Sequence, residues 1–386
     1  IVTGDTPGTA NEIGREIGLI GKDEEPQRIT GPEFAEMSHD DALALVRNPE
    51  FSILSRARPD DKARLVMLLQ EAGEVVAVTG DGTNDAPALS KAQIGLSMGD
   101  GTARAKEASA ITILDNSFSS INKAILWGRS LYMNIKRFIL FQMTINVSAC
   151  LIVMLGASLG IDSPLTVTQM LWVNLIMDTF AAMALSSLPA DKRVMNDKPR
   201  NPKSHIIDRS MLGNILCFGL LFTVILLCLW QFLWHNDVTE NVGVYDLLCK
   251  TNIKDFFLGL FDFSKSKAHL SAYEAGFFFT TFVMLQFWNL FNAKYFRSGR
   301  SLLLDIFAIF KGQNMFKLTF SKWFALIVAV ILTGQIVIIN FVGPLFNVAP
   351  LNVTDWLFIL LSTSLVLIIV DVVRTFYFFI HNKKVV

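Results

Sequence analysis

The hydrophobic pattern divides the chain into two parts. From residue 1 to about residue 125, short apolar runs alternate with helical patterns and charged residues, which is typical of a soluble α/β unit. From about residue 135 onward the apolar stretches are much longer. A helix needs about 20 apolar residues to cross about 30 Å of hydrocarbon, and these stretches reach that length. We therefore predict an α/β domain over 1–130 and an all-α membrane domain over 131–386.

Six segments of the second part have the length and character of membrane helices. They lie at about 136–159, 165–188, 211–234, 272–295, 322–343 and 354–380. The connections between them differ in basic residues, which gather after the second and fourth segments and at the end of the chain. These residues are Lys192, Arg193, Lys198, Arg200, Lys203 and Arg209, then Arg297, Arg300, Lys311 and Lys317, and finally Lys383 and Lys384.

The basic connections indicate the orientation of the membrane domain. Cytoplasmic loops carry an excess of lysine and arginine, whereas the turns at 160–164 and 343–354 contain neither residue. We expect an integral multi-pass membrane protein whose soluble domain and carboxyl terminus are cytoplasmic, in contact with the lipid bilayer of a plasma or other cell membrane.

Composition and the first residues add two expectations. The chain is 52% hydrophobic and carries 34 basic and 34 acidic residues, so no overall charge favours nucleic acid as a partner. It opens on Ile1-Val2-Thr3-Gly4-Asp5, which reads as a buried strand entered midway. We therefore expect the chain to be a piece of a longer protein.

A strand followed by a glycine turn predicts a phosphate and magnesium site. Val75 to Thr79 reads as a buried parallel strand, and it runs into Gly80-Asp81-Gly82-Thr83-Asn84-Asp85. Ligands bind at the carboxyl edge of such sheets, and carboxylate oxygens are hard ligands for Mg²⁺. Asp81 and Asp85 are the candidate ligands. An ordinary Asp-Gly turn with an Asx cap is the alternative.

Two further segments strengthen the phosphate hypothesis. Thr3-Gly4-Asp5 ends an earlier strand with the same three residues, and the Thr3 hydroxyl can reach a phosphate oxygen. Lys62 falls in the first turn of a helix that Pro59 starts. A lysine there neutralises a bound phosphoryl group, although most lysines are simply solvated.

Taken together, Thr3-Gly4-Asp5, Lys62 and the eleven residues from Thr79 to Leu89 resemble the later phosphatase-fold motifs of P-type ATPases. The resemblance implies an α/β fold like that of haloacid dehalogenases (HAD-like), present as a partial phosphorylation domain with a Rossmann-like parallel sheet. It implies that Asp81 binds Mg²⁺, that Asn84 and Asp85 complete the network, that Thr3 contacts the phosphoryl group, and that Lys62 balances its charge. ATP is then the substrate.

The family's nucleophile is missing from this chain. P-type ATPases form their phosphoenzyme on the aspartate of a DKTGT segment, and that string does not occur here. We expect the nucleophile, the nucleotide-binding domain, the actuator domain and the first four membrane helices to lie upstream, in the other half of the same pump. The chain alone is then inactive.

Polar residues inside two apolar segments mark a candidate ion site. Gln142 and Asn146 lie in the first segment, and Asn174 and Asp178 lie in the second. A charge inside a membrane costs about 2.5 to 3.5 kcal/mol on insertion scales, so each such residue is a functional candidate. A spacing of four places Asn174 and Asp178 on one face of an α-helix. Interhelical hydrogen bonding is the alternative role for the uncharged residues.

The sequences around these residues resemble type IIB pumps, the plasma-membrane calcium ATPases. The matching strings are FQMTINV from Phe141 and LWVNLIMDT from Leu171. Pumps that move two calcium ions carry acidic residues where this chain has Ala149 and, in the fourth apolar segment, Gln286. The resemblance therefore implies transport of one Ca²⁺ per cycle, with Gln286 a possible further ligand.

Two alternatives stay open. A P-type pump for another hard cation, Na⁺, H⁺ or Mn²⁺, would use the same oxygen ligands, because cavity size and ligand number decide selectivity. A membrane-tethered HAD-type phosphatase or regulatory half-protein would act without the nucleophile.

Overall fold

The computed structural model describes residues 1–21, 27–158, 165–198, 200–201, 204–252, 254, 259, 269–311 and 322–381. The chain divides into two compact units, Ile1–Leu126 with Pro199–Lys203, and Trp127–Lys198 with Ser204–Val386. The turn at 160–164 and four of the basic residues used to predict orientation lie outside the described residues. Those four are Lys203, Lys317, Lys383 and Lys384.

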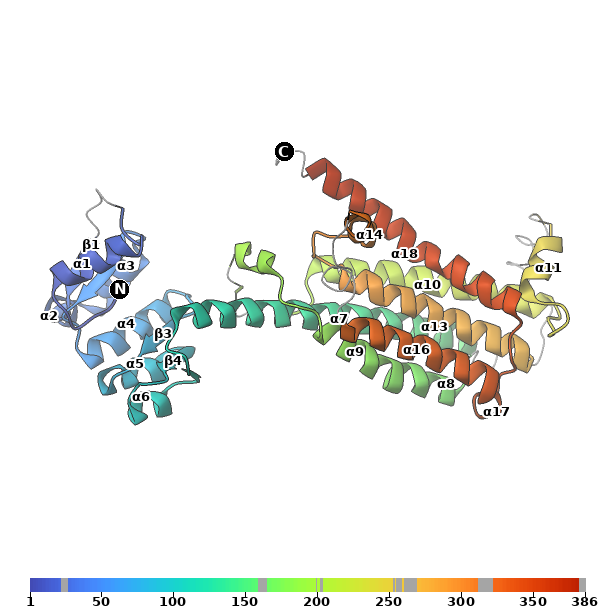
Figure 1. Ribbon diagram of the computed structural model, residues 1–386, viewed down its shortest axis with the longest axis horizontal. Helices are drawn as coiled ribbons and strands as arrows, with labels where there is room; N and C mark the ends of the chain where they lie inside the picture. The colour runs from blue at the N-terminus through green and yellow to red at the C-terminus, as the bar shows by residue number, and fades with distance from the viewer. Residues whose placement is uncertain are drawn as a thin grey trace. The chain divides into compact units, whose positions relative to one another are not determined.

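The first unit contains two parallel sheets (Figure 1). One pairs β1 (Gln27–Thr30) with β2 (Phe51–Ser55), and Val2 adds a parallel bridge to Leu54 of β2. The other has the order β3 (Ala77–Gly80), β4 (Ile94–Met98) and β5 (Ile111–Ile113). Parallel strands need crossovers, and the helices that alternate with these strands supply them. The helices are α1 (Pro7–Glu16), α2 (Gly31–Glu36), α3 (His39–Arg47), α4 (Pro59–Glu71), α5 (Ala86–Lys91) and α6 (Ala103–Ala108).

Local sequence explains where α4 begins. Pro59 occupies its first turn, and the buried carboxylate of Asp61 accepts the backbone N–H of Arg58 at 2.9 Å. Leu65 and Leu68 of α4 then pack with Phe34 and Leu54 in the core of this part of the unit. The α/β character predicted from the sequence is therefore present, whereas a single Rossmann-like sheet stays a prediction.

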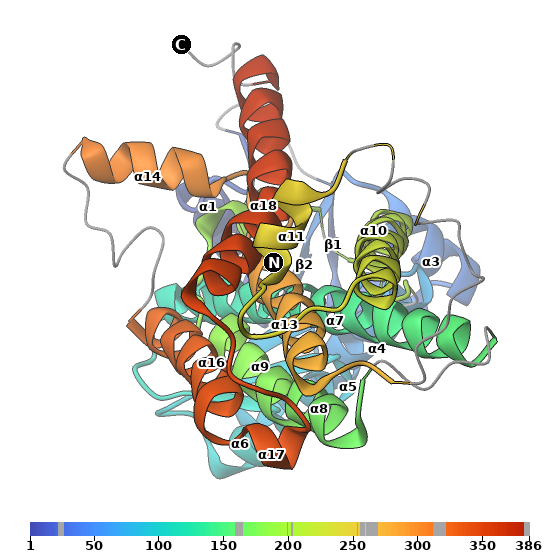
Figure 2. The same cartoon turned by 90° about the vertical axis from the view of Figure 1, so that its right-hand side faces the viewer.

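The second unit is a bundle of long helices (Figures 1 and 2). Most of the 41-residue helix α7 (Phe118–Ser158) belongs to this unit, and its first residues, up to Leu126, belong to the first unit. The helix begins before the predicted segment at 136, because no proline interrupts the stretch. The other long segments are α8 (Val167–Leu171) continuing through the π-helix η2 (Trp172–Met177) into α9 (Asp178–Ser186), then α10 (Arg209–His235), α13 (Ala272–Lys294), α16 (Lys322–Phe341) and α18 (Val353–His381). Shorter helices are η3 (Lys192–Asn196), α11 (Val244–Lys250), α14 (Leu302–Phe310) and α17 (Gly343–Phe346).

Among the described residues, five helices are long and apolar enough to cross a membrane. They are α7, the segment Val167–Ser186, α10, α16 and α18. α13 coincides with the remaining predicted segment but is not one of them. Its sequence includes Glu274, Gln286, Asn289 and Asn292, and it lies in the middle of the bundle against α10, α16 and α18 (Figure 2). A sixth membrane helix therefore stays a prediction.

Asp355 of α18 holds α11 in place. Its fully buried carboxylate accepts hydrogen bonds from the N–H groups of Val244 and Tyr245 at 2.9 Å each and from the hydroxyl of Tyr273 at 2.9 Å.

Asp355→Asn should lower the free energy of unfolding by about 2 to 3 kcal/mol, because the amide nitrogen of asparagine then faces an N–H donor. Thermal unfolding of the purified protein in detergent measures this. Asp246→Asn, an exposed change in α11, is the control, and equal melting temperatures of the two variants would contradict the assignment.

Asp208 caps α10 and makes the fold sensitive to acid. Partial burial raises the pKa of its carboxyl. The carboxyl accepts hydrogen bonds from Lys136 Nζ at 2.7 Å and from the Met211 N–H at 3.0 Å, and Arg297 lies 3.1 Å away. Together these partners outweigh the burial, so the pKa of Asp208 is below its ordinary value. The stabilisation is present above the ordinary aspartate pKa of about 3.9 and is lost as pH falls through the lower folded-state pKa. Asp208→Asn should remove this part of the acid dependence in unfolding titrations from pH 7 to pH 3, whereas Glu240→Gln, an exposed change, should preserve it.

Candidate functional sites

The turn after β3 carries the first candidate site. β3 ends at Gly80, and the 3-10 turn Thr83–Asp85 leads directly into α5. The Asp85 side chain folds back over this turn, where its Oδ2 accepts the Gly82 N–H at 3.2 Å. A Cβ atom at position 80 would collide with the Asp85 side chain, so the close approach requires glycine there.

Lys62 of α4 meets Asp85 at this turn. The Lys62 ammonium lies 2.7 Å from Asp85 Oδ1, and both side chains are largely buried, with 18% and 17% of their surface exposed. Both carboxylate oxygens of Asp85 are therefore engaged within the protein, one by Lys62 and one by Gly82. Asp81 and Asn84 point their side chains into exposed positions beside this pair.

The donor set at this turn fits Mg²⁺. Mg²⁺ is commonly held by one or two carboxylates together with substrate phosphates and water, and it does not need a cage of protein ligands. The exposed carboxylate of Asp81 is available for that role, whereas Asp85 is already bonded to Lys62. Among the described residues no group of three or more histidine, cysteine or acidic side chains gathers as a metal cage.

Thr3, Gly4 and Asp5 lie at the end of the other sheet. The Thr3 hydroxyl donates to Asp5 Oδ2 at 2.8 Å, and the Asp5 N–H returns to that hydroxyl at 3.1 Å. The Thr3 N–H donates to the Leu54 carbonyl at 3.0 Å, which aligns this segment with β2. No hydrogen bond or ion pair in the described part of the chain joins Thr3 or Asp5 to Lys62 or Asp81.

A second glycine turn, from Gly99 to Thr102, supports Asp81 and was not predicted from the sequence. The Thr102 N–H donates to the Asp81 carbonyl at 2.8 Å, and a Cβ at Gly101 would crowd the Asp81 backbone. The signal was available in the sequence, because Gly99-Asp100-Gly101-Thr102 repeats the Gly80-Asp81-Gly82-Thr83 string.

Asp178 and Gln142 form the second candidate site, inside the bundle. The Asp178 side chain is buried, and its Oδ2 accepts the Gln142 Nε2–H at 3.0 Å. Its other oxygen, Oδ1, is buried without a hydrogen-bond partner. A buried carboxylate with an unpaired oxygen is unfavourable unless a cation or a proton accompanies it.

The predicted partners of Asp178 are not all buried with it. The prediction of an uninterrupted α-helix here was wrong, because Trp172–Met177 is a π-helix. Asn174 is exposed while Asp178 is buried, and Asn146 on α7 is half-buried. A π-helix inside a membrane-type segment is often found at functional sites.

Gln286 of α13 is fully buried, and neither of its side-chain amide atoms has a partner. Ser148 of α7 shares this condition, with a buried hydroxyl that has no hydrogen-bond partner. Unpaired polar atoms in an apolar interior are expensive, so both positions are suited to a ligand or to water.

Comparison with known proteins identifies the family. A family model described as "Cation transporting ATPase, C-terminus" matches residues 162–376. The chain belongs to this cation-transporting ATPase family. A second model, described as "haloacid dehalogenase-like hydrolase", matches residues 63–125 of the ATPase chain and confirms the HAD-like character of the first unit.

Relatives narrow the resemblance further. The chain is 38% identical over 362 residues to Calcium-transporting ATPase 8, plasma membrane-type, of Arabidopsis thaliana, covering 92% of this chain and 30% of that protein. It is 35% identical over 375 residues to Plasma membrane calcium-transporting ATPase 3 of Homo sapiens, covering 93% of this chain and 28% of that protein. The predicted resemblance to plasma-membrane calcium ATPases is confirmed. The chain spans about 30% of the length of these relatives.

Proposed function

We propose that the chain is part of an ATP-driven calcium pump that works through an aspartyl-phosphate intermediate. The observation that carries the proposal is Asp178, a buried carboxylate with one unpaired oxygen between membrane-type helices. A hard divalent cation satisfies such an oxygen, and the relatives named above are calcium-transporting ATPases. Gln142 and Asn146 supply further oxygens, with Gln286 an additional candidate and Ala149 favouring one Ca²⁺ per cycle. Asn174, which is exposed on the π-helix, is not assigned to the site.

In the first unit we assign the phosphoryl group to the turn after β3. Lys62 neutralises charge on that group and is held in position by Asp85. Asp81 is the residue that would hold Mg²⁺, which when bound draws charge from the phosphate oxygens, and Asn84 contributes a neighbouring amide. Thr3 contacts the phosphoryl group through its hydroxyl, which Asp5 orients across Gly4.

The remaining parts of the pump come from other segments of the longer protein in this proposal. The DKTGT nucleophile does not occur here, and the relatives extend well beyond the matched region. One edge of β3 supports an additional partner, because among the described residues β3 is the first strand of the order β3-β4-β5 and pairs only with β4. A further strand on this edge would bring the nucleophile beside Lys62.

We further propose that α13 crosses the membrane as the sixth helix and that the basic connections face the cytoplasm. In this arrangement the first unit and the carboxyl terminus are cytoplasmic, and a plasma or other cell membrane contains the bundle. The described basic residues Arg193, Arg209 and Arg297 are exposed and support this side.

The test is calcium-dependent phosphorylation of the full-length protein by ATP in membrane vesicles. We expect phosphoenzyme and calcium uptake that both require calcium and magnesium. Activation by Na⁺, Mn²⁺ or H⁺ in place of calcium would contradict the choice of ion. Hydrolysis of a phosphate ester by this chain alone would instead favour the phosphatase.

A further inference from the structure

Three arginines bind the backbone carbonyls at the carboxyl end of α13. They are Arg374 of α18 to the Asn292 carbonyl at 2.9 Å, Arg137 of α7 to the Phe296 carbonyl at 3.2 Å, and Arg193 of η3 to the Ser298 carbonyl at 2.6 Å. The Asn292 carbonyl lies in the last turn of α13, where carbonyls lack intrahelical partners, whereas Phe296 and Ser298 lie in the turn that follows the helix. Backbone carbonyls away from water need a hydrogen-bond donor, and each arginine supplies one. The end of α13 is therefore the point where three other segments of the bundle are attached.

Arg137 differs from the other two because it continues into a second buried bond. Its Nη1 donates to Asn134 Oδ1 at 2.9 Å, and Asn134 Nδ2 donates to the Leu188 carbonyl at 3.4 Å. Arg137 and Asn134 expose only 6% and 5% of their surface. A buried chain of bonds thus joins the end of α13, one turn of α7 and the segment that follows α9.

This chain of bonds joins the two segments that carry the candidate ion site. Gln142 lies five residues after Arg137 on α7, which is about 7.5 Å along the helix axis at 1.5 Å per residue. Leu188 follows α9, the helix that Asp178 begins. The two elements that carry the bond between Gln142 and Asp178 are therefore both tied to Arg137.

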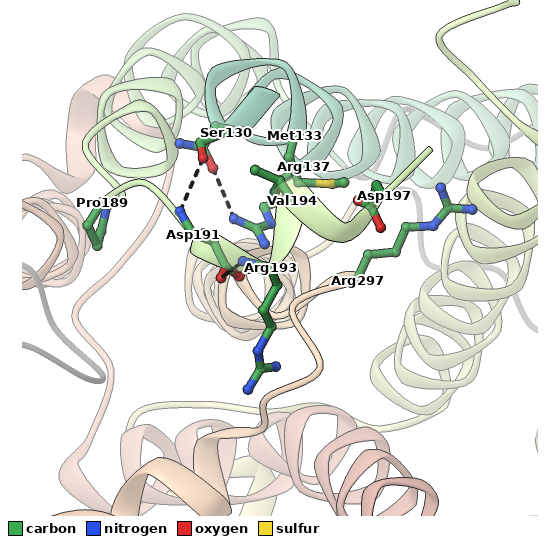
Figure 3. Close-up of a pocket in the computed structure, with 10 residues that line it drawn as sticks. Ser130, Met133, Arg137, Pro189, Asp191, Arg193, Val194, Asp197 and Arg297 are labelled. Atoms are coloured by element: carbon green, nitrogen blue, oxygen red, sulfur yellow. Dashed lines mark hydrogen bonds between the residues drawn. The ribbon is translucent and has the colours of Figure 1, made fainter. Parts of the chain in front are cut away.

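A small cavity borders Arg137 on one side (Figure 3). It measures about 60 Å³, and its lining includes Ser130, Met133, Asn134 and Asp191. Arg193 and Arg297 also border the cavity, but their guanidinium groups point away from that of Arg137. The arginines therefore do not converge on a shared anion, and the open side leaves room for small shifts of α7 around Arg137.

We propose that Arg137 is a positioning residue for ion binding, resting on the calcium-pump function proposed above. It fixes α7 against the end of α13 and, through Asn134, against the exit of α9, and so it sets the distance between Gln142 and Asp178. Loss of the Arg137 guanidinium group leaves the Phe296 carbonyl and Asn134 Oδ1 without their hydrogen-bond donor. α7 then shifts into the space of the cavity, and the ion site loses its geometry.

The test measures the calcium concentration that half-activates phosphorylation of the full-length pump by ATP. We expect Arg137→Gln to raise this concentration about tenfold, within the usual range of coupling between sites. Phosphorylation by inorganic phosphate without calcium should persist, because the first unit is unchanged. Arg137→Lys, which keeps the charge and one donor, should restore part of the affinity.

Arg193→Gln is the matched control. It removes the same type of bond to the same end of α13, but from η3 and not from α7. If the arginines only stabilise the helix end, both glutamine variants should lose thermal stability and neither should change calcium affinity. If Arg137 positions α7, only Arg137→Gln should change the half-activating concentration.

A double-mutant cycle with Asn134→Leu makes the test sharper. Arg137 and Asn134 belong to one series of hydrogen bonds, so their effects on the half-activating calcium concentration should not be additive. The double variant should therefore have the same half-activating concentration as Arg137→Gln alone. Two results would overturn the positioning role in a wild type that requires calcium. One is an unchanged half-activating calcium concentration in Arg137→Gln, and the other is an equal rise of that concentration in Arg193→Gln. A wild type that forms phosphoenzyme without calcium would overturn the proposed function itself.

Discussion

Asp178→Asn should lower calcium-activated phosphorylation of the full-length pump at least about 100-fold, equivalent to about 2.7 kcal/mol of lost ion binding. The change preserves the shape of the side chain but removes its negative charge. Asp178 is the buried carboxylate of the candidate site, so a divalent cation would have only amide and carbonyl oxygens left there. The measurement is phosphoenzyme formed from ATP as a function of calcium concentration.

Two comparisons separate ion binding from folding in this variant. Phosphorylation by inorganic phosphate in the absence of calcium should survive, because it needs the first unit and a folded bundle but no bound calcium. Thr179→Val is the neighbouring control, since the exposed Thr179 only donates its hydroxyl to the Leu175 carbonyl of its own helix at 2.5 Å. Asp178→Asn with an unchanged calcium response would remove Asp178 from the ion site.

Lys62→Met should reduce phosphoenzyme formation from ATP about 100-fold, because the variant loses a charge-assisted contact to the phosphoryl group. This reduction is equivalent to about 2.7 kcal/mol. Methionine keeps most of the side chain's length and apolar body but has no ammonium group. Its removal also leaves Asp85 Oδ1 without the bond at 2.7 Å, so the turn beside Asp81 loses its support. Phosphoenzyme measured at saturating calcium isolates this effect.

The control for this prediction is Lys91→Met, which changes an exposed lysine of α5 in the same unit. It should form phosphoenzyme at the wild-type level. Calcium binding by Lys62→Met should also stay at the wild-type level, because the change lies in the other unit of the chain. A Lys62→Met pump that phosphorylates normally would assign this lysine to the solvated surface.

The membrane-type helices could be read from the sequence because their signal is local. An apolar run of sufficient length needs no partner to be recognised, and five of the six segments meet the length and hydropathy of a membrane helix in the structure. The exception is α13, whose glutamine and asparagines lower its hydropathy. Its interior position explains them, since the neighbouring helices α10, α16 and α18 shield these side chains.

The start of α7 did not follow from the apolar pattern. The sequence predicted a segment from 136, where the apolar run begins, but the helix starts at Phe118. Hydropathy reports where a helix can meet lipid and not where its hydrogen bonds begin. Residues 118–135 mix charged and apolar side chains, so their helical continuation carries no membrane signal.

The sequence by itself determined which side chains are available at the two candidate sites, and from them it predicted their chemistry. The residue types and spacings of Thr3, Lys62, Asp81 and Asp178 indicated a phosphoryl group, magnesium and a hard cation, because ligand preference is a property of the side chain. The same strings predicted the resemblance to plasma-membrane calcium ATPases that the relatives confirm.

Only the tertiary structure decided which of these residues act together. It joined Lys62 to Asp85, left Asp81 exposed, bonded Gln142 to Asp178, and left Asn174 exposed. It also revealed Arg137 as the link between three helical segments. These outcomes depend on contacts between residues far apart in the chain and on backbone hydrogen bonding, and neither is encoded in the spacing of residues along one segment.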